Sequence, residues 1–295
     1  AVCSPDLPRF LVVDGYLKSS RDELVAGGAS MACDIYAAML RRFVPGAEVD
    51  YVFPADDASS LPAGAALAAY DGIAWTGCSL TVFEDEPRVR SQIDFCRAAF
   101  TAGVPSFGSC WALQIAVVAA GGLCAANPRG REMGIAHKIQ LTPEGRGHPL
   151  YAGKPSVFDA FISHVDEITH WPSTAVLLAS NQFTHVQAAA VTHEAGTFWG
   201  MQSHPEDDLH EMARLMYCRR EKLTELGFFR DVDQALAHSD LLETRHDDPT
   251  RRDIAWALAI DDDRLRPQIR QCQAGHRISQ QAVPGMQRRR CSPQP

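Results

Sequence analysis

Hydrophobic and polar positions along the first 120 residues follow the pattern of short buried strands separated by amphipathic helices. Apolar runs of strand length that lead into turn-forming residues occupy RFLVVDG (9–15), AEVDYVF (47–53), YDGIAWTGCS (70–79) and VPSF (104–107). Helical periodicity covers 29–43, 86–103 and 111–120. Because strands that alternate with helices pair in parallel, the pattern predicts an α/β fold with a mostly parallel central sheet flanked by helices.

Two of these helices carry end signals. In 29–43, Ser30 is the expected N-cap, and the predicted apolar stripe contains Met31, Ile35, Ala38, Met39 and Phe43. In 86–103, Pro87 lies in the first turn and Gly103 ends the helix.

After residue 130 the pattern changes to short strands, which we interpret as a small β-rich addition to the same domain. The predicted strands are 132–141, 157–163, 175–180, 186–192 and 197–202. Helices are expected over 207–226 and 249–260. The chain thus divides into one domain over 1–227, a helical extension outside the core over 228–270, and a polar tail over 271–295 that is expected to be disordered.

Composition and charge narrow the function classes. A net charge of −8 over 295 residues provides no general attraction to nucleic acid or to an anionic membrane. No apolar run reaches the length of a membrane span, and residues 1–20 lack the pattern of a secretory signal. Nine cysteines without a CxxC pair fit reduced thiols better than a disulfide framework. We therefore expect a cytoplasmic protein.

Cys110 stands where a predicted strand turns into a helix, within FGSCWALQ (107–114). A residue at such a turn projects its side chain clear of the sheet, and the helix N-terminus beside it favours an anion. For cysteine that anion is the nucleophilic thiolate, and nearby backbone N–H groups can stabilise the oxyanion of an attacked carbonyl. Gly108 permits the sharp backbone there. A buried structural cysteine is the alternative interpretation.

A thiolate needs a base, and WGMQSHPE (199–206) supplies a candidate in His204. The histidine follows a predicted strand, and Glu206 can orient its imidazole as the third member of a triad. His204 and Cys110 both follow predicted parallel strands, whose carboxyl ends share one edge of a sheet. The sequence thus predicts a Cys–His–Glu site at that edge.

FGSCWALQ and WGMQSHPE together resemble the two signature stretches of class I glutamine amidotransferases. IAWTGCS (73–79) takes the place of that family's Gly-rich oxyanion loop, and SHVDEI (163–168) resembles its Ser-His-x-Asp stretch. The resemblance, which spans about residues 10–225, implies a flavodoxin-like fold and a γ-glutamyl thioester intermediate. It implies Cys110 as nucleophile, His204 as base and Glu206 as the group that orients the base.

The resemblance also assigns residues around the triad. Backbone N–H groups near Gly77, Cys78 and Trp111 are expected to form the oxyanion hole. The expected substrate pocket consists of Gln114, Ser163, His164 and Asp166. Two departures stand out, because Ala112 occupies a position where glycine is usual and TGCS (76–79) replaces a Gly-Gly-Pro loop. We interpret Cys78 as a small buried filler.

No metal and no other cofactor is expected. The histidines show no ligand-like spacing, and GKPS (153–156) lacks the upstream glycine of a phosphate-binding loop. Without such a loop these residues encode no ATP-using synthetase module, so any consumer of ammonia would be a synthetase partner in trans.

Three functions remain open at this point. The first is a glutaminase-type amidotransferase, which releases ammonia from the glutamine side chain through a thioester on Cys110. The second is a free-standing hydrolase of γ-glutamyl amides or peptides in a degradation pathway. The third is a non-catalytic regulatory subunit, against which the complete Cys, His and Glu set argues. The first two share a γ-glutamyl substrate and cannot be separated by sequence.

Overall fold

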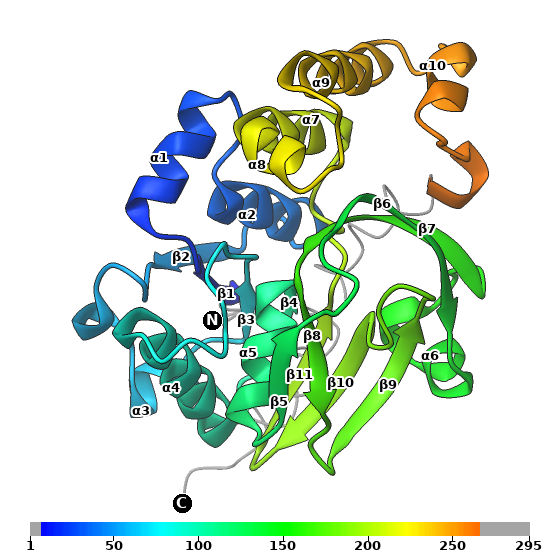
Figure 1. Cartoon of the computed structure of the whole chain (residues 1–295). Helices are drawn as coiled ribbons and strands as arrows, with labels where there is room; N and C mark the ends of the chain where they lie inside the picture. Colours follow the sequence, from blue (N-terminus) through cyan, green and yellow to red (C-terminus); the bar gives the residue numbers. More distant parts are fainter. Residues whose placement is uncertain (1–6, 266–295) are drawn as a thin grey trace, which may run out of the picture.

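The computed structural model describes residues 7–265 and has a nine-stranded sheet at its centre (Figure 1). The tail predicted over 271–295 lies outside the described residues. Five neighbouring strands run parallel, in the order β2 (Glu48–Val52), β1 (Arg9–Val13), β3 (Gly72–Trp75), β4 (Ser106–Ser109) and β11 (Gly196–Met201). The predicted α/β class with a large, mostly parallel sheet is confirmed.

The β-rich addition continues the same sheet beyond β11 with antiparallel strands. These are β10 (Ala188–His193), β9 (Ala175–Ser180), β6 (Glu132–Leu141) and β7 (Val157–His164). In Figure 1, β6 and β7 arch over one end of the sheet. A separate pair is formed by β5 (Leu123–Ala126) and β8 (Asp166–His170). The segment between β6 and β7 carries the short helix α6 (Pro143–Gly147).

Helices cover both faces of the parallel half. Along β1, Leu11 and Val13 join the apolar cluster under α3 (Gly64–Ala68), α4 (Pro87–Ala102) and α5 (Trp111–Ala119). Phe10 and Val12 point the other way, into the cluster under α2 (Ala32–Phe43). This alternation follows from the two-residue period of a strand. A further helix, α1 (Lys18–Ala26), follows β1.

The ends of α4 lie where the sequence predicts, with Pro87 as its first residue and Gly103 in the left-handed conformation at φ 68°. The prediction for α2 is wrong in two respects. Ser30 is not the N-cap, because the helix begins after Met31 without a side-chain cap, and the Ser30 N–H instead bonds to Glu211. The buried face is also rotated, so that Met39 is the one buried residue of the predicted stripe.

The face of α2 that contacts the sheet contains Cys33, Tyr36, Ala37, Met39 and Leu40. Tyr36 fixes this rotation, since it packs against Phe107 and donates a hydrogen bond to Ser109. The buried face of α2 is therefore set by a polar contact, which a prediction from apolar positions alone does not include.

Four further helices form a group beside the sheet, seen at the top of Figure 1. The helix predicted over 207–226 is broken at Arg219 into α7 (Leu209–Cys218) and α8 (Arg220–Glu225). They are followed by α9 (Val232–Asp247) and α10 (Arg252–Ala257). The four share a third apolar cluster with Phe161 of β7, apart from the two clusters on the sheet. Within residues 7–265, no helix is both long enough and apolar enough to span a membrane.

Candidate active site

Cys110 occupies a strained turn between β4 and α5. Its backbone adopts φ 51° and ψ −104°, a left-handed conformation that costs free energy for a non-glycine residue and is typical of functional sites. The strain is held by neighbours, because the Cys110 N–H donates to the Met201 carbonyl at 2.6 Å. The thiol is buried and lies 3.4 Å from the Ser163 carbonyl oxygen. The predicted strand-to-helix elbow is present.

His204 reaches the same edge of the sheet from β11. Met201 and Ser109 are register partners on parallel strands, so the residues that follow each of them emerge side by side. The His204 N–H bonds to the Phe161 carbonyl at 2.8 Å, which ties this segment to β7. Its imidazole Nδ1 lies 2.9 Å from Glu206 Oε1. Within the described chain, Nε2 is buried without a hydrogen-bond partner and is the ring nitrogen left for a reacting proton.

The electrostatics of His204 favour the protonated imidazole. Burial opposes the charge, but the negative charge of Glu206, its hydrogen bond to Nδ1 and the nearby Cys110 thiol outweigh it and raise the pKa of His204 well above its usual value. Asp207 lies 3.9 Å from Nδ1, and burial raises its pKa to about 8. Glu206 Oε1 lies closer to Nδ1, at 2.9 Å, so Glu206 is the carboxylate that directly supports the imidazolium.

A buried chain of hydroxyl groups holds Glu206 in place. Tyr36 donates to Ser109 Oγ at 2.8 Å, and Ser109 donates to Glu206 Oε1 at 2.6 Å. Glu206 Oε1 therefore accepts from Ser109 on one side and from His204 on the other. Sequence reasoning missed both hydroxyl residues. Ser109 had a signal in its position before the cysteine, whereas Tyr36 had none.

The loop after β3 brings Gly77 against His204. A Cβ built on Gly77 would lie 3.0 Å from His204 Cε1, so a side chain at this position would crowd the imidazole. The Thr76 hydroxyl donates to the Gly77 carbonyl at 2.8 Å and accepts from the Gly15 N–H at 3.1 Å. Because a trans peptide directs its C=O and N–H to opposite sides, this contact fixes the direction of the Cys78 N–H.

Side chains beyond Thr76 also fasten this loop. The Cys78 thiol donates to the Gly15 carbonyl at 2.9 Å, and the Gln92 amide donates to the same carbonyl at 3.2 Å. Gln92 in turn accepts from the Trp111 indole at 2.8 Å. Burial raises the pKa of Cys78 to about 12, so its thiol keeps the proton that it donates to Gly15. Trp111 is the first residue of α5, so its N–H has no partner within the helix.

A cavity of about 260 Å³ opens beside the thiol. Its wall includes all four residues expected in the substrate pocket, namely Gln114, Ser163, His164 and Asp166, together with Cys78, Cys110 and Trp111. Asp166 is the one carboxylate residue in the described wall, and burial raises its pKa to about 6. At pH 7 Asp166 is mostly ionised and supplies a negative charge.

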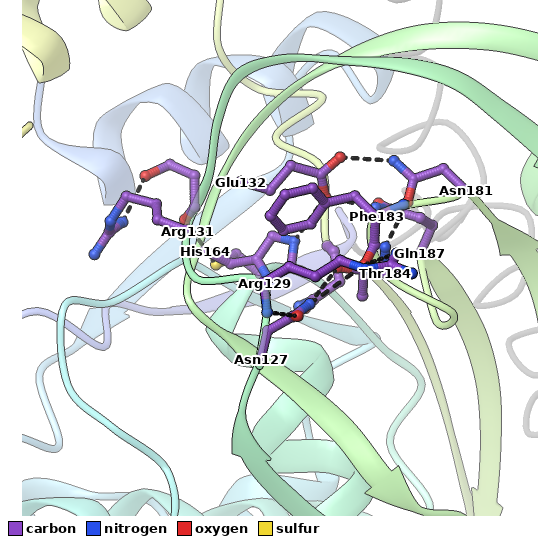
Figure 2. A network of polar contacts seen from close by, with 12 residues as sticks. Asn127, Arg129, Arg131, Glu132, His164, Asn181, Phe183, Thr184 and Gln187 are labelled. Carbon is purple, nitrogen blue, oxygen red and sulfur yellow. Dashed lines mark hydrogen bonds and ion pairs between the residues drawn. The ribbon is translucent and has the colours of Figure 1, made fainter. Parts of the chain in front are cut away.

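The His164 ring stabilises the cavity wall through hydrogen bonds. Its Nδ1 contacts the Asp166 carbonyl at 2.9 Å and its Nε2 contacts Glu132 Oε2 at 3.0 Å, so both nitrogens are already paired with protein (Figure 2). Glu132 also accepts from Gln187 at 2.9 Å and from Asn181 at 2.6 Å. This network joins β6 to β7 and to the loop after β9, and it fixes the start of β6, next to Arg131.

Sequence reasoning missed three cationic residues in the cavity wall, Arg131, Arg219 and Lys222. Arg131 points away from the Glu132 network in Figure 2, and Arg219 projects from the break between α7 and α8. Among the described residues, the donor atoms of His204, Glu206 and Asp207 come close enough to hold a metal ion. The Nδ1 of His204 is engaged with Glu206, an arrangement suited to proton transfer.

A family model matches the sequence of the chain across this site. The model of the class I glutamine amidotransferases covers residues 49–219, more than half of the chain. The chain belongs to the class I glutamine amidotransferase family. It is therefore an enzyme of the glutamine amidotransferase type, which acts on a γ-glutamyl amide, as the sequence predicts.

Members of the family differ in how much of their length this chain matches. A γ-glutamyl-L-1-hydroxyisopropylamide hydrolase from a Pseudomonas species is 34% identical over 230 residues, covering 76% of this chain and 76% of that protein. A glutamine-hydrolysing GMP synthase from Thiobacillus denitrificans is 33% identical over 147 residues. That match covers 46% of this chain but 25% of the GMP synthase, so the chain spans about a quarter of such a relative.

Solved structures support the fold. The crystal structure of a glutamine amidotransferase from Thermotoga maritima aligns with a TM-score of 0.60 over 81% of this chain and 95% of that one. Since the identity is 14%, this likeness concerns the fold alone.

Proposed function

We propose that this enzyme hydrolyses the γ-glutamyl amide of a small amine without the help of a partner. In this mechanism the Cys110 sulfur attacks the γ-carbonyl carbon, and His204 accepts the thiol proton and gives it to the leaving amine. Water, deprotonated by His204, then hydrolyses the γ-glutamyl thioester and releases glutamate. Glu206 keeps Nδ1 protonated and stabilises the imidazolium. The strained elbow and the 2.9 Å His204–Glu206 contact support these roles.

One observation favours a free-standing hydrolase. The oxyanion loop after β3 (76–79) is held in place by contacts within this chain. Hydrogen bonds of Thr76, Cys78 and Gln92 connect this loop to Gly15. Gln92 also accepts from the Trp111 indole, which connects the loop to α5. In this proposal the Cys78 and Trp111 N–H groups bind the oxyanion. A donor loop that is already ordered needs no second protein to populate its active state. The similarity to a γ-glutamyl amide hydrolase over three quarters of both chains points the same way.

The second candidate is a glutaminase that feeds ammonia to a synthetase in trans. The similarity to GMP synthases favours it, although that match covers about a quarter of their length. Such a donor would turn over glutamine slowly alone and faster with its synthetase, because idle hydrolysis wastes glutamine. Six described cysteines, all unpaired, support a reducing, cytoplasmic setting for either candidate.

The two candidates are separated by turnover of the isolated protein. We expect a γ-glutamyl amide of a small alkylamine or amino alcohol to release its amine rapidly, with glutamine the poorer substrate. The measurement is amine release against ammonia release at equal substrate concentration. Slow glutamine turnover that rises on addition of a synthetase, with γ-glutamyl alkylamides inert, would establish the second candidate instead.

The covalent step is tested by three substitutions. Cys110→Ala and His204→Ala are expected to lower kcat by roughly 10⁴-fold or more with the fold intact, because a triad acts as a unit. Glu206→Gln is expected to be milder, since Glu206 acts through His204. A glutamine-like chloroketone should label Cys110, and mass spectrometry of the labelled protein checks this. Full activity of Cys110→Ala would exclude the thioester.

A further inference from the structure

Two arginines meet at the cavity wall without an acidic partner. Arg131 precedes β6 and Arg219 lies between α7 and α8, yet both donate to the Ser163 hydroxyl oxygen, at 3.4 Å and 2.8 Å. Within residues 7–265, neither guanidinium forms an ion pair with a carboxylate. The site therefore holds two like charges side by side, and Lys222, which pairs with Glu225, adds a third cation to the cavity wall.

Such an arrangement is unfavourable, and the charge of Asp166 in the same cavity offsets it only in part. The Arg131 Nε is buried without a hydrogen-bond partner among the described residues. Burial and the nearby charge of Arg219 both lower the pKa of Arg131. A buried unpaired donor and a repelled like charge each cost free energy, which a bound carboxylate would recover. Because both arginines donate to Ser163 Oγ, the hydroxyl hydrogen of Ser163 remains available to the same anion.

Ser163 also relates this site to the nucleophile. Its carbonyl oxygen lies 3.4 Å from the Cys110 thiol, while its side chain meets the two guanidiniums. An extended glutamyl group spans four C–C bonds, or roughly 5 Å, from its γ-carbonyl carbon to its α-carboxylate carbon. A glutamyl group with its γ-carbonyl at the thiol can therefore direct its other end to the arginines. Asp166 supplies the opposite charge in the same cavity.

We infer that Arg131 and Arg219 bind the free α-carboxylate of the γ-glutamyl group and select substrates that carry it. This inference rests on the proposed function and adds to it a substrate requirement. Guanidinium groups suit this role because their planar donors match a carboxylate in charge and shape. The enzyme then accepts varied amines on the scissile side and tests the glutamyl side for a free carboxylate.

The kinetic test compares two substrates that differ at one group. The first is a γ-glutamyl alkylamide, and the second is the same amide with its α-carboxylate converted to a carboxamide. We expect the wild-type enzyme to prefer the first by roughly a hundredfold in kcat/KM, because the second leaves both guanidiniums unpaired. Equal turnover of the two would overturn the inference even if no variant folds.

Substitutions then assign the preference to residues. Arg219→Met and Arg131→Met are each expected to raise KM for the carboxylate substrate roughly ten- to a hundredfold, to change kcat little, and to reduce the preference. Arg219→Lys should restore part of it. Arg220→Met is the matched control, since this neighbour bonds to Tyr217 and does not line the cavity. If the arginines were only structural, both substrates would suffer equally and the preference would survive.

A binding measurement keeps the inference separate from the proposed function. In Cys110→Ser, titration calorimetry with L-glutamate and with its α-carboxamide, isoglutamine, reports the subsite without any turnover. Tight glutamate binding that is lost in Arg219→Met, with isoglutamine bound weakly by both, supports the subsite even if no amide is hydrolysed. Equal binding of the two ligands refutes the subsite and leaves the hydrolase proposal standing.

Discussion

The raised pKa of His204 has a consequence for the pH dependence of turnover. Because Glu206 and Cys110 stabilise the imidazolium, His204 keeps its proton to higher pH than an ordinary histidine and can still protonate the leaving amine there. The alkaline limb of kcat/KM is therefore expected well above pH 6.5. Glu206→Gln removes a charge that raises the pKa, so the limb should move to lower pH.

A pH–rate profile of both enzymes checks this. Glu194→Gln is the control, because Glu194 is an exposed residue at the opposite end of β11. An unmoved alkaline limb in Glu206→Gln would show that a group other than His204 sets it.

The hydroxyl chain predicts that Ser109 and Tyr36 position the base. Ser109→Ala removes one of the two donors to Glu206 Oε1, so the carboxylate and the imidazole lose a constraint. We expect kcat to fall roughly tenfold with KM nearly unchanged, and Tyr36→Phe to have a smaller effect of the same kind. Steady-state kinetics test this, with Tyr70→Phe as control, since its hydroxyl bonds to Asp50 away from the site. A change in KM alone would contradict positioning.

The residues of the site differ in how readily a sequence discloses them. Cys110, His204 and Glu206 were found because each lies in a short stretch whose local geometry already suggests its chemistry. Arg219 and Tyr36 gain their meaning from contacts with residues 56 and 73 positions away. Such partners depend on the packing of whole elements, and no local pattern encodes them.

At the scale of elements, the turn at Cys110 depends on close packing beside Gly108. A Cβ at this position would lie 2.4 Å from Ala112 Cβ and 2.6 Å from the Trp75 carbonyl oxygen. Gly108→Ala is therefore expected to force β3, β4 and α5 apart and to lower the free energy of unfolding by about 1–3 kcal/mol. Gly147→Ala is the control, because no atom lies within 4 Å of the added Cβ. Denaturant unfolding of the two variants should differ clearly; equal stability would contradict the packing account.

Elements with regular patterns were predicted well, and those set by tertiary contacts were not. The parallel strands and α4 follow from apolar runs, a proline and a glycine. The break at Arg219 had no such signal, since Cys218, Arg219 and Arg220 all suit a continuous helix. In the structure, the break accompanies a change of direction by which α8 packs Leu223 into the third cluster. Tertiary packing here overrides local propensity.

At the scale of the whole molecule, the helices after α8 take part in the site indirectly. Met212 and Met216 of α7 are buried in the third cluster, to which α9 and the segment around α10 add Leu242, Ile254, Leu258 and Leu265. The same cluster contains Phe161, whose carbonyl oxygen accepts the His204 N–H. Packing of this group therefore supports both the base and the helix that ends at Arg219.

A truncation measures this support. A chain ending at residue 227 exposes the apolar side of α7, so we expect it to be less stable than a chain ending at 265, which keeps every contact described. Its kcat/KM should also fall, through a higher KM, because Arg219 loses its fixed position.

If the shorter chain is too unstable to purify, Leu242→Ala replaces it, with an expected loss of about 2–5 kcal/mol in the free energy of unfolding. Trp256→Ala, at a side chain 88% exposed, should cost less than about 0.5 kcal/mol. Thermal unfolding and kinetics of the chains ending at 227 and 265 decide the matter, and identical behaviour would show that the helices after α8 are dispensable to the site.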